Sequence, residues 1–280
     1  MATLTLPASS ARTVVRRLYF YGVALVSFMA ALVALNILLQ TLTAVWLDRA
    51  WLEVVDFTYV RDTVAAGGGL LLVATPIFLL HWGFAQRRAD EEERRSALRK
   101  LFLYGASLVA VGYALYYSYE LLQGLALLAL GEPALSTPIW PSKWLADLLM
   151  VIAGTALQAY FHTILVQDGD YGAEIGGAGA LRRLYQTLAG LVGLALVILG
   201  VGGVIETLAL LLLEMSERTV GIGWWRSGVG SGIAQALVGA LLVRINWMRW
   251  RTLAVRHPAE AQTALRRFYL YGSVVIGALA

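Results

Sequence analysis

Long apolar runs, separated by short polar segments, dominate the chain. Six of them reach about 20 residues, the length at which a helix crosses a hydrocarbon core of about 30 Å. They cover approximately residues 18–42, 65–84, 101–125, 144–166, 184–212 and 230–250. A seventh run starts at Phe268 and stops at Ala280, too short to span, so we expect the natural chain to continue. The pattern predicts an all-α fold, a polytopic transmembrane helical bundle.

A basic-aromatic signature occurs four times, and each copy opens an apolar run. The copies are Arg16-Arg17-Leu18-Tyr19-Phe20-Tyr21-Gly22, Arg99-Lys100-Leu101-Phe102-Leu103-Tyr104-Gly105, Arg182-Arg183-Leu184-Tyr185, which lacks the second tyrosine and the glycine, and Arg266-Arg267-Phe268-Tyr269-Leu270-Tyr271-Gly272. Their spacings are 83, 83 and 84 residues. Such a period predicts tandem parallel two-helix repeats of about 83 residues. The predicted divisions are a cytoplasmic tail at 1–15, repeats at 16–98, 99–181 and 182–265, and the start of an incomplete fourth repeat at 266–280.

A second recurrent feature closes the second helix of each predicted repeat. His81-Trp82, His162-Thr163 and Asn246-Trp247 occupy this place. Together with the signatures, these dipeptides resemble those of an uncharacterised bacterial membrane family, domain of unknown function 5671, over residues 16–280. The resemblance implies repeated membrane helix pairs. It implies no activity, because none is established for that family.

The basic residues are distributed unevenly between the two sides of the predicted bundle. The N-terminal tail and the linkers that enter the signatures hold 17 of the 22 Lys and Arg residues, and the alternate loops hold 5. Because basic residues collect in cytoplasmic loops, we expect a multi-pass protein of the bacterial inner membrane with a cytoplasmic N-terminus. The net charge of +4 is explained by this topology and does not indicate nucleic-acid binding. All nine tryptophans lie near predicted helix ends, as in an aromatic belt.

Composition excludes several classes of function. The chain is 59% hydrophobic and 14% charged, whereas soluble domains carry about 25% charged residues. The absence of cysteine excludes disulfides, thiolate catalysis and iron–sulfur clusters. We find no catalytic triad, carboxylate pair or metal-ligand pattern, and therefore expect no enzyme activity, no cofactor and no metal. The leading interpretation is a structural or accessory membrane subunit, either as a homo-oligomer or within a larger membrane complex.

The signature side chains are predicted to anchor the helices at the lipid headgroups. Basic groups approach phosphates there, and tyrosine rings are favoured at the same depth. The residues assigned to this role are Arg16, Arg17, Tyr19, Tyr21, Arg99, Lys100, Tyr104, Arg182, Arg183, Tyr185, Arg266, Arg267, Tyr269 and Tyr271. A specific anionic-lipid site between repeats is the alternative to plain anchoring.

Two other interpretations remain open at this point. Tyr113, Tyr117 and Glu120 share one helix face, and a polar face inside a membrane bundle is typical of a transporter or channel pocket for a ligand or ion. His81 and His162 have equivalent places in two repeats and are suited to ligate haem iron. Against haem, Asn246 takes that place in the third repeat.

The linkers and small residues carry further predictions. Residues 87–98 mix opposite charges at a spacing typical of a continuous helix. Residues 46–59 alternate as in an amphipathic helix on the membrane, and the glycines in 169–179 predict a flexible linker. Small residues recur every four positions and predict close helix packing at Gly228, Gly232, Ala236 and Ala240.

Overall fold

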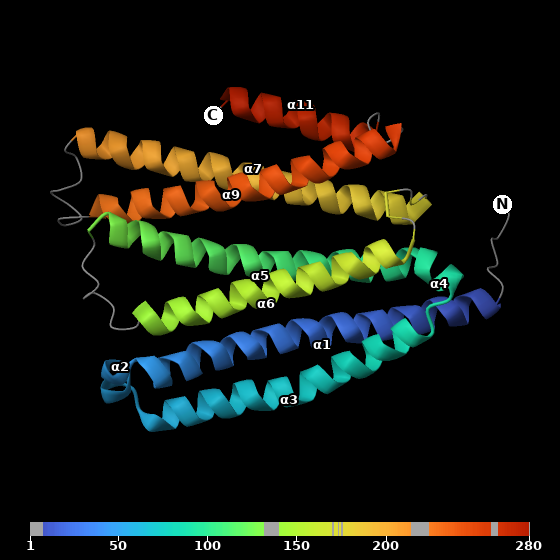
Figure 1. Ribbon diagram of the computed structural model, residues 1–280, viewed down its shortest axis with the longest axis horizontal. Coiled ribbons are helices and arrows are strands. Elements are labelled where there is room, and N and C mark those ends of the chain that lie inside the picture. Colours follow the sequence, from blue (N-terminus) through green and yellow to red (C-terminus); the bar gives the residue numbers. More distant parts are fainter. Residues whose placement is uncertain are drawn as a thin grey trace. The chain divides into compact units, whose positions relative to one another are not determined.

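The computed structural model describes residues 8–131, 140–169, 171, 172, 174, 176–213, 224–258 and 263–279. Over these residues every regular element is a helix, so the all-α fold is confirmed. The helices are α1 (Ala8–Leu47), α2 (Arg49–Val54), α3 (Phe57–Arg87), α4 (Glu91–Arg95), α5 (Ala97–Ala129), α6 (Trp140–Gln167), α7 (Gly176–Leu212), α9 (Trp224–Arg256) and α11 (Ala264–Leu279) (Figure 1).

Six of these helices are long and apolar enough to cross a membrane, namely α1, α3, α5, α6, α7 and α9. Each extends beyond the apolar run that predicts it, because backbone hydrogen bonding continues into the polar ends of the helix. α1, for example, begins at Ala8 and ends at Leu47. The six helices agree with a multi-pass integral membrane protein. The repeat boundaries, the type of membrane and the orientation stay predictions.

The chain divides into two compact units. The first comprises Met1–Val111 and Ala156–Leu181, and the second comprises Gly112–Thr155 and Arg182–Ala280. The division falls inside the long helices α5, α6 and α7, so each unit contains parts of helices that begin or end in the other. The contacts described below all lie within one unit.

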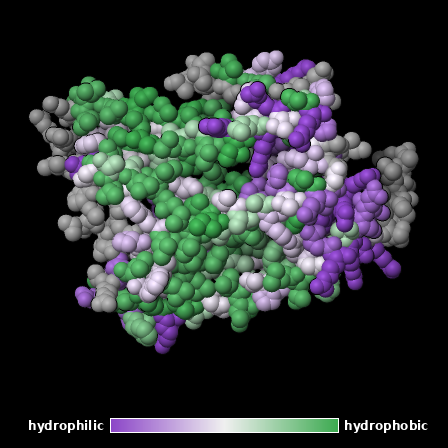
Figure 2. Space-filling view, in the orientation of Figure 1, coloured by the Kyte–Doolittle hydropathy of each residue, from purple (hydrophilic) through white to green (hydrophobic). Residues whose placement is uncertain are grey.

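In the first unit, α1 and α3 pack against each other and are connected through α2. Aromatic side chains form its core. The ring centroids of Trp82 and Phe102 lie 4.8 Å apart, and those of Phe28 and Phe161 lie 5.3 Å apart. Outward, Leu72 is 76% exposed, as expected for a lipid-facing side chain. Figure 2 shows hydrophilic residues gathered around α4 and the beginning of α1, and hydrophobic residues along α1 and α3. The unit thus has a polar end and an apolar side.

In the second unit, α7 and α9 approach each other closely through small residues. A Cβ atom added at Gly232 would lie 2.6 Å from the Gly200 carbonyl oxygen, and one added at Gly200 would lie 2.5 Å from the Ala236 nitrogen. At Gly228 the added atom would meet the Thr207 side chain. The predicted close packing of the small-residue stripe is therefore confirmed at Gly228, Gly232 and Ala236.

Two linker predictions fail because aspartates cap new helices. Residues 87–98 are not one helix: Asp90 accepts a hydrogen bond from the Glu93 nitrogen at 2.7 Å and starts α4, which ends before Ser96. Within α4, an exposed i,i+4 ion pair joins Glu91 to Arg95 at 2.7 Å. Residues 46–59 are likewise divided among the end of α1, the six-residue α2 and the beginning of α3, and Asp48 and Asp56 cap the last two helices. An N-cap residue has non-helical backbone angles, so the preceding helix cannot continue through it.

The third linker prediction, a flexible segment at 169–179, is wrong for its last four residues. α7 already begins at Gly176, which has a φ of 60°. Gly172, with a φ of 94°, donates its backbone N–H to the Glu174 carboxylate at 2.8 Å. Glycine adopts these left-handed conformations without strain, which suits it to both positions.

Candidate functional site

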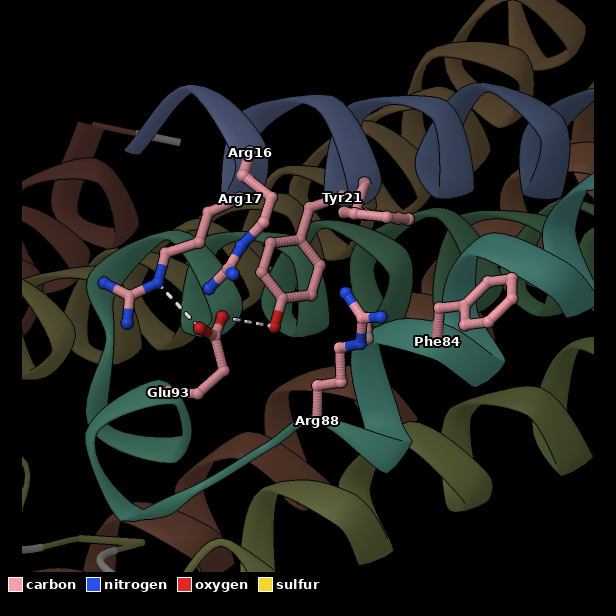
Figure 3. Close-up of a pocket in the computed structure, with 8 residues that line it drawn as sticks. Arg16, Arg17, Tyr21, Phe84, Arg88 and Glu93 are labelled. Carbon is pink, nitrogen blue, oxygen red and sulfur yellow. Dashed lines mark hydrogen bonds and ion pairs between the residues drawn. The ribbon is translucent and has the colours of Figure 1, made fainter. Parts of the chain in front are cut away.

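The first signature binds an acidic residue that follows 72 residues later. Arg17 and Tyr21 lie about one turn apart on α1 and both reach Glu93 of α4 (Figure 3). The Arg17 Nε donates to one carboxylate oxygen at 2.7 Å, and the Tyr21 hydroxyl donates to the other at 2.8 Å. Arg17 also contacts the exposed Glu92 at 3.1 Å. Asp90 caps α4 and so fixes the position of Glu93 in the linker, where its carboxylate contacts α1.

The second signature holds a more deeply buried ion cluster. Arg99 donates to both carboxylate oxygens of Asp168, at 2.9 Å each, and to the Gln86 side-chain oxygen at 2.7 Å. The Lys100 ammonium lies 3.6 Å from the same aspartate. The guanidinium of Arg99 also stacks 5.6 Å from the Trp82 ring centroid. Two buried cations therefore share one buried carboxylate, and further polar and aromatic contacts surround Arg99.

The first and the second signature each form a hydrogen bond from a tyrosine to a glutamate. Tyr104 has the place in the second signature that Tyr21 has in the first, and its hydroxyl donates to Glu174 at 3.0 Å. Like Glu93, Glu174 lies in the linker that follows the helix pair. The sequence interpretation missed these acids, because acidic residues in a linker are usually solvated. The available signal was a glutamate about 70 residues after the second signature tyrosine in both repeats.

The third signature replaces this arrangement with uncharged groups. Thr187 stands where the tyrosine would be, and it is buried. Asn246 of α9 donates its side-chain amide to the Gln186 backbone oxygen of α7 at 2.9 Å. Asn246 is the residue that occupies the histidine position in this repeat. Here it joins two helices through this hydrogen bond.

Burial in the signatures does not agree with a general role as lipid anchors. Arg99, Lys100 and Arg182 are at most 1% exposed, and the tyrosines 21, 104 and 269 are also buried. By contrast, the side chains available at the surface are those of Arg16, Tyr19, Arg267 and Tyr271. Arg17, Arg183 and Tyr185 are intermediate, and the side chain of Arg266 is outside the described residues. Headgroup contact requires access, so Arg99, Lys100 and Arg182 serve the interior of the protein, whereas Arg16 and Arg267 stay available to lipid.

The predicted tryptophan belt is likewise incomplete. Trp46 is 78% exposed, as an interfacial anchor should be. Trp82 is buried and donates its indole N–H to the Tyr160 hydroxyl at 2.8 Å. Trp250 is also buried, with its ring centroid 4.7 Å from that of Tyr269. Position near a helix end alone did not distinguish the core tryptophans from those facing lipid.

The two candidate haem ligands have separate local contacts. The Nδ1 of His81 lies 2.8 Å from the Ile77 backbone oxygen, and its Nε2 lies 3.4 Å from the Tyr19 hydroxyl. The His162 ring packs edge-on against Tyr171, with centroids 5.2 Å apart. Both ring nitrogens of His81 therefore face protein groups. Among the described residues, no group of three or more His, Asp or Glu side chains is placed to hold a metal ion.

The polar face of α5 belongs to an ion cluster in the second unit. Tyr113 and Tyr117 stack with ring centroids 6.1 Å apart. Glu120 accepts from the Lys143 ammonium at 2.7 Å, and Asp147, which is fully buried, accepts from the same ammonium at 2.7 Å. The sequence analysis identified the glutamate but missed its partner Lys143 and the second acid of the cluster, Asp147, both on α6. Their signal was the i,i+4 spacing of Lys143 and Asp147.

The sequence was compared with family models, curated proteins and solved structures. A family model described as a domain of unknown function (DUF5671) matches residues 17–156 and 183–280. The two matched segments begin at Arg17 and Arg183, which have the same place in the first and third signatures. No curated protein and no solved structure matches the chain.

Proposed function

The chain belongs to the domain of unknown function 5671 family, and we propose that it is a structural or accessory membrane subunit without catalysis. The observation that carries the proposal is the internal use of its buried charges. Arg99 and Lys100 both pair with Asp168, and the two carboxylate oxygens of Glu93 accept from Arg17 and Tyr21. Groups engaged in this way join helix ends to one another and are not poised to bind or convert a substrate.

The outer surface supports the same proposal. Large apolar side chains are exposed on each long helix pair, among them Val26 on α1, Leu72 on α3, Leu199 on α7 and Leu237 on α9. Such faces contact either lipid tails or the helices of a neighbouring subunit. In membranes, helix association depends on close packing, which the α7–α9 contact of this protein uses already. We therefore propose association with further copies of the chain or with a larger membrane complex.

Site-specific cross-linking tests this proposal, because the chain contains no native cysteine. Single cysteines at the exposed positions Val26, Leu72, Leu199 and Leu237 are oxidised in intact membranes. We expect at least one to give a disulfide-linked dimer or, with a bifunctional thiol reagent, a link to another protein. Ala24→Cys, buried on the same helix as Val26, is the control and should give no product.

Purification in mild detergent completes the test. A complex larger than the 30.4 kDa chain is expected when the detergent contribution is subtracted by light scattering. An isolated monomer without partners, together with no cross-link from any exposed position, would contradict the subunit proposal.

A transporter or channel is the second candidate, favoured by the cluster of Glu120, Lys143 and Asp147. Asp147 has no exposed surface, and the stacked tyrosines 113 and 117 adjoin this region of α5. Proton and potassium fluxes into proteoliposomes would be measured under an imposed membrane potential. A flux that Glu120→Gln abolishes, and that Glu53→Gln in the exposed part of α2 leaves intact, would establish this function in place of the first. Absence of flux would exclude it for these ions.

A further inference from the structure

A small pocket beside the first signature has more positive charge than its ion pairs neutralise. Three arginines, Arg16, Arg17 and Arg88, line it together with a single acid, Glu93. In Figure 3, Arg16 comes from α1 and Arg88 from the end of α3, and both side chains are directed toward the space around Tyr21. The pocket therefore lies where two helix ends of the first unit meet.

Two of the three arginines, Arg16 and Arg88, have no carboxylate partner among the described residues. Arg17 is neutralised by Glu93 at 2.7 Å and Glu92 at 3.1 Å. Both oxygens of Glu93 are occupied, by Arg17 and by the Tyr21 hydroxyl. Among the residues that the structure describes, neither Arg16 nor Arg88 forms an ion pair or hydrogen bond through its side chain. An anion in this pocket would be attracted by two unpaired guanidinium groups.

The second repeat shows what the first one lacks. Arg99 has the signature position of Arg16, and it is bound by Asp168, the residue directly after Gln167 at the end of α6. In the first repeat the corresponding glutamine is Gln86, and the residue after it is Arg87. A cation thus replaces the acid. The first repeat has no internal carboxylate for its arginine, and an external anion would complete the same arrangement.

The surroundings of the pocket resemble a membrane boundary. Phe20 and Phe84 form part of its wall, with ring centroids 6.5 Å apart. On α1, the neighbouring Val15 and Leu18 are 65% and 60% exposed. Guanidinium groups bind phosphate oxygens in a planar, often bidentate geometry, and an apolar surface beside them accommodates acyl chains.

We propose that this pocket binds a phosphate group, with Arg16 and Arg88 as its ligands. The phosphate belongs either to the headgroup of an anionic phospholipid or to a free phosphate anion, and the adjacent apolar surface favours the lipid. Arg17 and Glu93 hold the wall of the pocket and do not bind the anion. The site goes beyond the proposed subunit function and does not depend on it.

Lipid binding would be measured on the full chain in a non-ionic detergent by native mass spectrometry. The probes are phosphatidylglycerol and, as the zwitterionic comparison, phosphatidylcholine. We expect phosphatidylglycerol to bind at least about tenfold more tightly. Arg16→Gln or Arg88→Gln should each weaken it about fivefold, and the double variant about twenty-fivefold, since a basic residue at an anionic surface contributes about that factor. Arg12→Gln, an exposed charge one turn earlier on α1, should change the affinity less than twofold.

Ala85 provides a second, opposite test, because it lines the pocket and carries no charge. Ala85→Asp introduces a carboxylate beside the two arginines and should abolish the preference for phosphatidylglycerol. Ala85→Asn has nearly the same shape and should retain most of it. Helical content and unfolding temperature are recorded for every variant, so that binding is compared only between folded proteins.

A separate titration with inorganic phosphate identifies the source of the group. Stabilisation by millimolar phosphate, lost in the double variant and without selective lipid binding, would support the pocket and assign it to a soluble anion. Selective binding of phosphatidylglycerol would assign it to lipid. Equal binding of both lipids with no phosphate effect, or unchanged binding in the folded double variant, would overturn the proposal.

Discussion

Two helix contacts, one in each compact unit, are held together in different ways. In the first unit, helix ends are joined by buried charges, most deeply where Arg99 and Lys100 meet Asp168. In the second unit, α7 and α9 approach along their length, and a Cβ atom at Gly200 would lie 2.6 Å from the Gly232 carbonyl oxygen. In the first contact, complementary charge determines which helix ends pair. In the second, complementary shape determines how the two helices pack.

This difference has an energetic consequence. Burying a charge costs several kcal/mol of desolvation, which a partner recovers only with good geometry. The ion clusters therefore specify the pairing of helix ends more than they increase stability. Close packing between small residues gains many weak dispersion contacts and avoids the desolvation cost. The Arg99–Asp168 cluster should therefore tolerate changes of shape better than changes of charge, and the α7–α9 contact the reverse.

The largest expected effect is the loss of the charge at Asp168. Asp168→Asn retains the shape but leaves Arg99 and Lys100 buried without a counter-charge, so we expect a loss of about 3–5 kcal/mol in the free energy of unfolding. The measurement is denaturant unfolding in detergent micelles, followed by the helical circular dichroism signal. Asp62→Asn removes the partner of Arg61 in an exposed pair, both side chains being more than 60% exposed, and should cost at most about 1 kcal/mol. Equal effects of the two substitutions would contradict the account of the first unit.

An intermediate effect is expected at the α7–α9 contact. Gly200→Ala places a methyl group against the backbone of α9 and should destabilise the protein by about 1–3 kcal/mol. Gly202→Ala, two residues along the same helix, meets nothing within 4 Å and should stabilise it by about 0.5–1 kcal/mol. The two substitutions are compared in the same unfolding assay. If both changed stability in the same direction, the shape-based packing of α7 would be disproved.

The smallest effect is expected for the tyrosine–glutamate bonds. Tyr21→Phe and Tyr104→Phe each remove one hydrogen bond to a glutamate that keeps another donor, so each should cost about 1 kcal/mol. Tyr271→Phe, at a side chain that is 70% exposed, should have nearly no effect. A double variant with Glu93→Gln would show how strongly Tyr21 and Glu93 are coupled. No coupling between them would mean that the recurrent bond contributes nothing to the first unit.

Much of the candidate site could not be predicted from the sequence. The signatures were recognised from their period, but Glu93, Asp168 and Glu174 were not recognised as their partners. Each of these acids lies about 70 residues from the signature residue that it binds. Charged residues in a linker have the same local pattern whether they face water or a buried arginine. Only the return of the chain past α3 and α6 distinguishes these cases.

The sequence by itself determined the helices, because an apolar run of sufficient length must satisfy its backbone hydrogen bonds internally in a membrane. Six helices long enough to span followed from that requirement alone. Tertiary structure decided which face of each helix turned inward. Arg16 and Arg99 have the same place in two similar signatures, yet one is exposed and the other is almost completely buried. The deciding difference is an acid on another helix end, and the energy of a buried charge depends on such a distant partner rather than on its neighbours in the chain.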